Sequence, residues 1–369
     1  TASTTRTVTW EVADANSNLS VVTDGNGTGG QVSATGKYIL IKDFGGDDKH
    51  IYRKNLLTDE VEVVDADSQG NLSTGDSQTP LDISADGRYV LFDLDEYGDV
   101  DLDGDGSDAS APGPLYRKDM DTGAIDRVDI PSDGVAVPLN WSVGDAALSA
   151  DGQSVVFFHN SSALMGGDGS QANQIYHKNL VTGELRVVAS DVDGTVPTLP
   201  GGDGAVSSGY GIGVSTDGTM VSFLHNGGGL VAGAPTAQQL YVKNMATGEV
   251  TLASSSSDGT PAENFNSGTG AFISPDGRYV AFTNGSSNLV DGVSGGPQLY
   301  VKDLQTGEIE VASATADGTV GDGFSSAGNA SFSADGRYLA FESSASNLDS
   351  GDTNDKYDIF VKDLQTGAI

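Results

Sequence analysis

Residues 274–282 read Ser-Pro-Asp-Gly-Arg-Tyr-Val-Ala-Phe, and close copies occupy residues 84–92 and 333–341. An Asp-Gly pair between two runs of alternating apolar residues is a strong hairpin signal, because the turn needs a residue with positive φ. The apolar run after the turn is typical of a buried strand. Weaker copies bring the total to six, centred on Gly36, Gly87, Gly152, Gly218, Gly277 and Gly336.

A second motif completes the repeat. Each copy is followed, after a loop, by a run such as Leu299-Tyr300-Val301-Lys302, and in five of the six copies by a Thr-Gly turn. A short β-rich run comes next, for example residues 308–312. We therefore expect each copy to form four antiparallel strands joined by hairpins. The motif holds while its spacing varies, which indicates constant strands and variable loops.

These repeats predict an all-β fold, a six-bladed β-propeller of four-stranded antiparallel blades that forms a single domain over residues 1–369. The sixth copy ends at Ile369, where its fourth strand should begin, whereas residues 6–12 form an alternating strand with no partner strands before it. We expect the N-terminal strand, Val8–Val12, to complete the last blade and close the ring, which removes an exposed sheet edge.

The Ser-x-Asp-Gly-Arg-Tyr-Val-x-Phe and Tyr-Val-Lys-Asp-x-x-Thr-Gly signatures resemble the propeller repeats of the TolB type over essentially the whole chain. This resemblance implies a propeller. It does not select an activity, because such repeats occur in periplasmic scaffold proteins, in peptidase propellers and in secreted modules.

Composition narrows the classes of partner. The formal net charge is −34, which excludes nucleic acid and anionic membrane surfaces as expected partners, because both require a basic surface. Such acidity favours cation binding, and it is equally typical of a salt-adapted or generally soluble secreted surface. The chain has no cysteine, so thiol chemistry and disulfides are excluded. No apolar run approaches the ~18 residues of a membrane span, and Thr1–Thr5 is not a signal peptide.

The turn lengths predict which face carries the function. The turns between the first and second strands and between the third and fourth strands are tight, whereas the other connections are long. In an up-and-down blade the long connections share one rim, so we expect a ligand or partner on that loop-rich face, around the channel.

The second blade's long loop holds the densest acidic cluster. Carboxylates at alternate positions followed by glycine can wrap a hard cation such as Ca²⁺, and the run resembles the first half of an EF-hand loop. It departs from that pattern at Ser110, where the EF-hand has glutamate. The alternative is a solvated acidic loop, but its carboxylates would repel one another. The predicted ligands are Asp99, Asp101, Asp103, Asp105 and Asp108.

A second candidate cation site lies in the sixth blade's long loop. Oxygens of Asp352, Asn354 and Asp358 could share a cation, or they could form Asx turns that shape the loop.

Histidines offer the weak catalytic candidates. His159 and His225 occupy one repeat position, each at the end of a second strand and each followed by asparagine. Imidazoles near a channel could bind a transition metal or act as a general base. We place Asp93, Asn284 and Ser343 at the same position in other blades, so the more economical interpretation is a polar residue that usually ends this strand. His177 and the once-per-blade lysines are expected to be structural.

Two function hypotheses follow. The first is a non-catalytic binding or scaffold module, calcium-stabilised and secreted, periplasmic or at the cell surface, with a protein or carbohydrate partner. We expect a monomer or a domain of a larger protein. The second is a polysaccharide lyase or hydrolase that uses His159, His225 or channel carboxylates. No G-x-S-x-G, Walker or H-E-x-x-H motif is present, and the long loops contain few of the basic residues that a uronate lyase needs.

Overall fold

The computed structural model describes residues 19–21, 31–43, 50–73, 78–94, 102, 114–132, 146–165, 171–196, 212–226, 228–263, 265, 271–293, 296–354 and 356–369. In these residues every regular element is a β-strand except one 3₁₀ turn, η1 (Ser162–Met165). None of the helical structure described has the length or the apolar character that a membrane crossing requires.

The strands form six antiparallel sheets in chain order, and within each sheet the strands pair in sequence order. The first three sheets consist of β1 (Leu19–Val21), β2 (Tyr38–Asp43), β3 (Ile51–Asn55) and β4 (Val61–Val63); β5 (Gln78–Ile83), β6 (Tyr89–Leu94), β7 (Leu115–Asp119) and β8 (Ile125–Arg127); and β9 (Ala146–Leu148), β10 (Ser154–Ser161), β11 (Gln171–Asn179) and β12 (Leu185–Val187).

The last three sheets consist of β13 (Gly213–Val214), β14 (Met220–His225), β15 (Gln239–Asn244) and β16 (Val250–Leu252); β17 (Ala271–Ile273), β18 (Tyr279–Asn284), β19 (Gln298–Asp303) and β20 (Ile309–Val311); and β21 (Ser325–Phe332), β22 (Tyr338–Ser343) and β23 (Asp358–Asp363). Five sheets therefore have the predicted four strands, and the sixth has three among the described residues.

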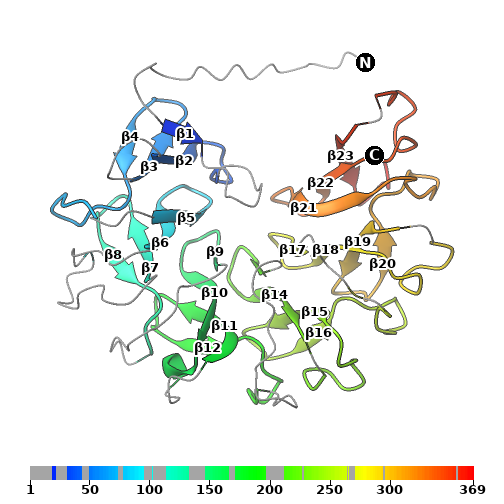
Figure 1. Ribbon diagram of the computed structural model, residues 1–369, viewed down its shortest axis with the longest axis horizontal. Coiled ribbons are helices and arrows are strands. Elements are labelled where there is room, and N and C mark those ends of the chain that lie inside the picture. Colours follow the sequence, from blue (N-terminus) through cyan, green and yellow to red (C-terminus); the bar gives the residue numbers. More distant parts are fainter. Residues whose placement is uncertain are drawn as a thin grey trace.

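Figure 1 shows the sheets arranged around a common centre, as in a β-propeller. First strands such as β5, β9 and β21 lie toward the centre, and fourth strands such as β8, β12 and β16 lie outside. The first and sixth sheets flank a gap in this circle. The all-β class and the four-stranded antiparallel unit are confirmed. Val8–Val12 lie outside the described residues, so closure by that strand stays a prediction.

The repeated Ser-x-Asp-Gly motif builds the tight turn and joins it to the preceding sheet. Ser84 Oγ accepts the Tyr89 N–H at 2.9 Å and donates to Asp86 Oδ1 at 2.7 Å. Gly87 has a φ of 81°, and a Cβ at this position would lie 2.1 Å from Cδ2 of Tyr38 in the first sheet. Glycine is therefore required both by the turn and by the close approach of the two sheets.

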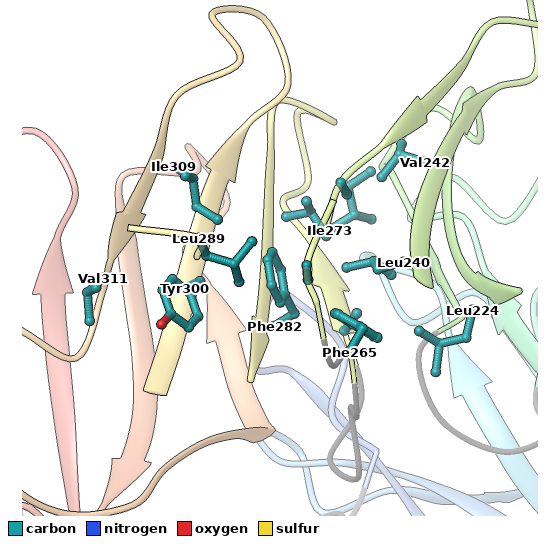
Figure 2. Packing of buried hydrophobic residues seen from close by; sticks show 14 of the residues in the cluster. Leu224, Leu240, Val242, Phe265, Ile273, Phe282, Leu289, Tyr300, Ile309 and Val311 are labelled. Atoms are coloured by element: carbon teal, nitrogen blue, oxygen red, sulfur yellow. The ribbon is translucent and has the colours of Figure 1, made fainter. Parts of the chain in front are cut away.

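The apolar core is divided among the interfaces between consecutive sheets. In Figure 2, Leu240 of the fourth sheet faces Phe282 of the fifth, with Tyr300 beside it. Buried tyrosines of the third strands stack on the phenylalanines of the second strands, as Tyr300 does on Phe282 with ring centroids 5.9 Å apart. Each sheet is thus held mainly by its neighbours, as in other repeat architectures.

Buried lysines join each sheet to the one before it. Lys302 is almost fully buried, and its Nζ donates to the backbone oxygens of Ser255 at 3.0 Å and Ser256 at 2.9 Å, in the connection after β16. Burial lowers the pKa of Lys243 to about 8. The same contact recurs in five sheets, from Lys118 to Ala66, Lys178 to Ile130, Lys243 to Ser190, Lys302 to Ser255 and Lys362 to Ala314. The predicted structural role of these lysines is confirmed.

Another third-strand position reaches forward to the next sheet. Arg53 Nη1 donates to the Gly87 carbonyl at 2.5 Å, and Arg117 Nη1 donates to the Gly152 carbonyl at 2.6 Å. His177 Nε2 lies 3.1 Å from the Gly218 carbonyl, and burial lowers its pKa. The structural role predicted for His177 is confirmed. The later sheets have valine at this position, namely Val242, Val301 and Val361.

We expect Lys302→Met to lower the free energy of unfolding by about 2–3 kcal/mol, because it keeps the buried chain but leaves the buried Ser255 carbonyl and the half-buried Ser256 carbonyl without their charged donor. Chemical denaturation measures this loss. The matched control is Lys356→Met, at an exposed lysine of the sixth sheet's loop, which should change stability by less than about 0.5 kcal/mol. Equal effects of the two substitutions would contradict a role for the carbonyl contacts.

Candidate functional site

The loop-rich face is built from the ends of the second strands and the starts of the third strands. The opposite face carries tight turns, such as the one closed by Gly277 N–H to the Ser274 carbonyl and the one closed by Gly307 N–H to the Asp303 carbonyl. Because all paired strands are antiparallel, the longer connections lie together on the other face. The candidate residues of this face can therefore be compared sheet by sheet.

His159 and His225 are inside the molecule. The residues are 0% and 2% exposed, near the ends of β10 and β14, where they pair across the sheet with Gln174 and Gln239. The rings of His225 and Tyr241 contact each other in a T-shaped arrangement, with centroids 6.1 Å apart. Neither imidazole presents its surface to solvent.

The strand register also corrects one expectation. Asn284 and Ser343 pair with the first residues of β19 and β23, so they do match His159 and His225. Asp93 instead pairs with Leu115, which places it one residue earlier in the repeat, so its alignment with the histidines was wrong. Asp93 had been matched to the histidines because it is polar. Its position counted from the turn glycine of its own repeat is one residue earlier than theirs, which excludes the match.

In the fourth and fifth sheets a buried glutamine at the start of the third strand is hydrogen-bonded to a serine after the fourth strand; we call this pair of side chains the tie. Ser254 Oγ donates to Gln239 Oε1 at 2.5 Å, and Gln239 Nε2 donates to the Ala262 carbonyl. In the fifth sheet Ser313 Oγ donates to Gln298 Oε1 at 2.6 Å. Each tie links the start of the third strand to the connection after the fourth strand. Sequence reasoning missed it because its partners are about 15 residues apart in a loop region.

The first sheet has an ionisable version of this tie. His50 and Asp65 occupy the glutamine and serine positions, with His50 Nδ1 2.7 Å from Asp65 Oδ2. Asp65 is fully buried and also accepts Ile51 N–H at 2.9 Å and Ser73 Oγ at 2.7 Å. A carboxylate that orients an imidazole is also the arrangement of a general base. Here Ser73 donates to the carboxylate, and its hydroxyl is therefore directed at Asp65 and not at the imidazole.

The second and third sheets lack parts of the tie. In the second sheet Pro114 replaces the glutamine, and Asp129 accepts Arg127 Nε at 2.9 Å instead. In the third sheet Ala189 replaces the serine, and within the described residues the buried Gln174 Oε1 has no hydrogen-bond partner. A buried acceptor without a donor lowers stability.

We therefore expect Ala189→Ser to raise the free energy of unfolding by about 1 kcal/mol, because the new hydroxyl would donate to Gln174 Oε1 as Ser254 does to Gln239. The control is Ala312→Ser, one position before Ser313, where the hydroxyl would enter the apolar contact between the fifth and sixth sheets and lower stability. Urea unfolding of the two variants measures both signs. A loss of stability in Ala189→Ser would contradict the proposed hydrogen bond.

The predicted cation ligands divide into two groups. Asp99, Asp101, Asp103, Asp105 and Asp108 lie outside the described residues. In the sixth sheet's loop, Asn354 Nδ2 donates to Asp358 Oδ2 at 3.0 Å, and the Asn354 N–H donates to Asp352 Oδ1 at 3.2 Å. The predicted Asx-type hydrogen bonds are therefore present, with the amide N–H₂ turned to Asp358. The described residues contain no group of three or more His, Asp or Glu side chains that could hold a metal.

Equivalent hollows lie at three successive sheet interfaces, with volumes of about 510, 490 and 370 Å³. Each one is lined by residues of a fourth strand and by a buried lysine, Lys243, Lys302 or Lys362. The lysine ammonium groups already donate to backbone carbonyls. These hollows are part of the repeating interface.

Comparisons with known proteins identify the fold. No family model matches the chain, and no curated protein matches it. Among solved structures it is similar to a prolyl endopeptidase, with 13% identity and a TM-score of 0.50 over 96% of this chain and 42% of that chain. It is also similar to TolB from Acinetobacter baumannii (18% identity, TM-score 0.39, 76% and 52% covered) and to an oligogalacturonate lyase in complex with manganese (16%, 0.49, 90% and 75%).

The chain spans about half the length of that Acinetobacter baumannii TolB. Together with the six sheets around one centre, the similarity to the prolyl endopeptidase structure supports a β-propeller fold for this chain.

Proposed function

We propose that the chain is a non-catalytic binding or scaffold module whose protein or carbohydrate partner binds the loop-rich face. The observation that carries this proposal is the burial of the polar groups beneath that face. His159, His225, Gln239 and Gln298 lie inside the sheets, where the glutamines tie the strands to their connections. The polar side chains thus build a platform, and the variable loops above it supply the recognition surface.

The rival function, a polysaccharide lyase or hydrolase, would need an accessible acid or base. His159 and His225 are its named candidates, and a substrate could not reach either imidazole without moving the sheet ends. The net charge of −34 also opposes binding of an acidic polysaccharide. We therefore favour the binding module.

The proposal includes the architecture that presents this face. The six sheets are the blades of one ring, and Val8–Val12 pair with β23 to supply the fourth strand of the sixth blade. The three-stranded sixth sheet, with β23 as its outermost described strand, supports this pairing. We place the protein outside the cytoplasm, secreted, periplasmic or at the cell surface, as a monomer or as a domain of a larger protein.

Incubation with a panel of polysaccharides that includes oligogalacturonate tests the function. We expect neither unsaturated products nor new reducing ends, because both candidate imidazoles, His159 and His225, are buried. Retention of the protein on the same polysaccharides in affinity electrophoresis would identify a carbohydrate partner. Turnover that is lost in His159→Ala or His225→Ala, with folding retained, would establish the enzyme instead.

The cation part of the proposal is Ca²⁺ bound by the loop of Asp99, Asp101, Asp103, Asp105 and Asp108, which it would relieve of carboxylate repulsion. We expect the thermal midpoint to fall in EDTA and to recover on addition of excess Ca²⁺, because a ligand of the folded state raises stability by mass action. Asp103→Asn with Asp105→Asn should remove the response. An unchanged midpoint in EDTA would exclude this ion.

A further inference from the structure

In the first two sheets the repeat surrounds an arginine of the third strand with the same three groups. Arg53 Nη2 donates to Glu62 Oε2 at 2.5 Å, and its Nη1 donates to the Gly87 carbonyl of the next sheet. Its guanidinium also lies over the ring of Tyr38, with Cζ 4.3 Å from the ring centroid. We call the acid, the tyrosine ring and the glycine carbonyl the arginine site, because each of them stabilises a guanidinium.

The second sheet repeats the arginine site. Arg117 donates to Asp126 and to the Gly152 carbonyl, and its Cζ lies 4.6 Å from the centroid of the Tyr89 ring. In both sheets the acid lies directly opposite the arginine across the strand pair. The register of the third and fourth strands and the turn of the next sheet therefore set the position of the site.

The fifth sheet keeps these groups but lacks the arginine. Val301 stands at the arginine position, directly opposite Glu310 in the strand register. Tyr279 is two residues after its turn glycine, which is the position of Tyr38, and the turn glycine of the next sheet is Gly336. The acid, the ring and the carbonyl of an arginine site thus occur here around a small apolar side chain.

A hollow of about 510 Å³ lies at this position. Its lining includes Tyr279, Val301 and Glu310 of the fifth sheet and Leu364, which follows the third strand of the sixth. Desolvation by these surroundings raises the pKa of the Glu310 carboxyl, although the residue is exposed to solvent. The hollow therefore combines apolar walls, an aromatic ring and a carboxyl group.

The cations of the chain near this hollow have other partners. Arg278 Nη2 pairs with Asp303 Oδ2 at 2.7 Å. Lys362 attracts the Glu310 carboxylate, but its Nζ donates to two backbone carbonyls. Within the described part of the chain neither Glu308 nor Glu310, which both line the hollow, forms an ion pair. The hollow is thus complementary in charge and shape to a guanidinium from another molecule.

We propose that this hollow binds the side chain of an arginine presented by a protein partner. The guanidinium would lie over Tyr279, pair with Glu310 and donate to the Gly336 carbonyl. These are the contacts that Arg53 makes in the first sheet. Lysine fits less well, because its ammonium is a point charge and does not stack on a ring as a planar guanidinium does. Tight-turn residues such as Thr306 line the hollow, so this surface is separate from the loop-rich face.

A fluorescently labelled glycine–serine peptide with one central arginine tests the proposal, with lysine and citrulline versions as controls. We expect the arginine peptide to bind the full chain in fluorescence anisotropy at low ionic strength. Glu310→Gln should weaken this binding about fivefold or more, because a charge-assisted hydrogen bond is lost.

The matched control is Glu308→Gln, which removes one charge from the same hollow. Its counterpart in the first sheet, Glu60, accepts a hydrogen bond from Thr58 and not from Arg53, so we expect a loss of less than about twofold. Equal losses in the two variants would overturn the proposal, as would equal binding of the lysine peptide. Failure of the arginine peptide to bind at millimolar concentration would overturn it as well.

Val301→Arg provides a second arm that needs no partner. The chain's own arginine would then fill the hollow, so we expect it to block the arginine peptide and to raise the thermal midpoint relative to Val242→Arg. Val242 is the matched position, because the fourth sheet has Met220 and Thr251 in place of the tyrosine and the acid. A folded Val301→Arg chain that binds the peptide as the parent does would overturn the proposal. If that variant does not fold, the comparison of Glu310→Gln with Glu308→Gln decides.

Discussion

The contact of one sheet with the next is the interaction on which this molecule depends. A sheet of three or four short strands cannot bury both of its faces, so its apolar side chains must be covered by neighbours. The lysine of each third strand adds a charge to this contact, and a buried ammonium group is tolerated only when hydrogen-bond acceptors replace its water. The carbonyls after the preceding fourth strand supply them, as Ser255 and Ser256 do for Lys302. This requirement explains why strand motifs are constant while loop lengths differ.

The interfaces are equivalent in geometry and unequal in chemistry. The first three sheets reach forward with Arg53, Arg117 and His177, and the last three have valine at that position. The tie beneath the loop-rich face varies in the same way, from glutamine with serine in two sheets to His50 with Asp65 in the first. The same backbone arrangement accepts either pair of side chains, because both pairs supply an oxygen to the backbone N–H at the start of the third strand. The N–H of Ile51 and that of Leu299 each find an oxygen there.

Most of the fold could be predicted because its signals are local. The Asp-Gly turns, the alternating strands and the recurrent lysines each lie within about ten residues, and the structure confirms their roles. The candidate site was harder to predict because its contacts join distant segments. His159 and His225 are buried and pair across the sheet with Gln174 and Gln239, and the serine partner of Gln298 lies beyond the fourth strand. Asp93 was misplaced because a polar residue type was weighed above the strand register.

The strong excess of acidic residues limits the kinds of ligand that the surface can bind. The chain has 18 lysines and arginines against 52 acidic residues, and five of the lysines are buried in the sheet interfaces. Four aspartates, Asp65, Asp93, Asp119 and Asp129, are buried as well, so the surface remains about as acidic as the composition indicates. Several arginines of the tight-turn face, such as Arg278 and Arg337, are held in pairs with Asp303 and Asp363. The partner that we propose for the loop-rich face would meet a chain with 52 acidic and 18 basic residues, which favours neutral or cationic ligands over anionic ones.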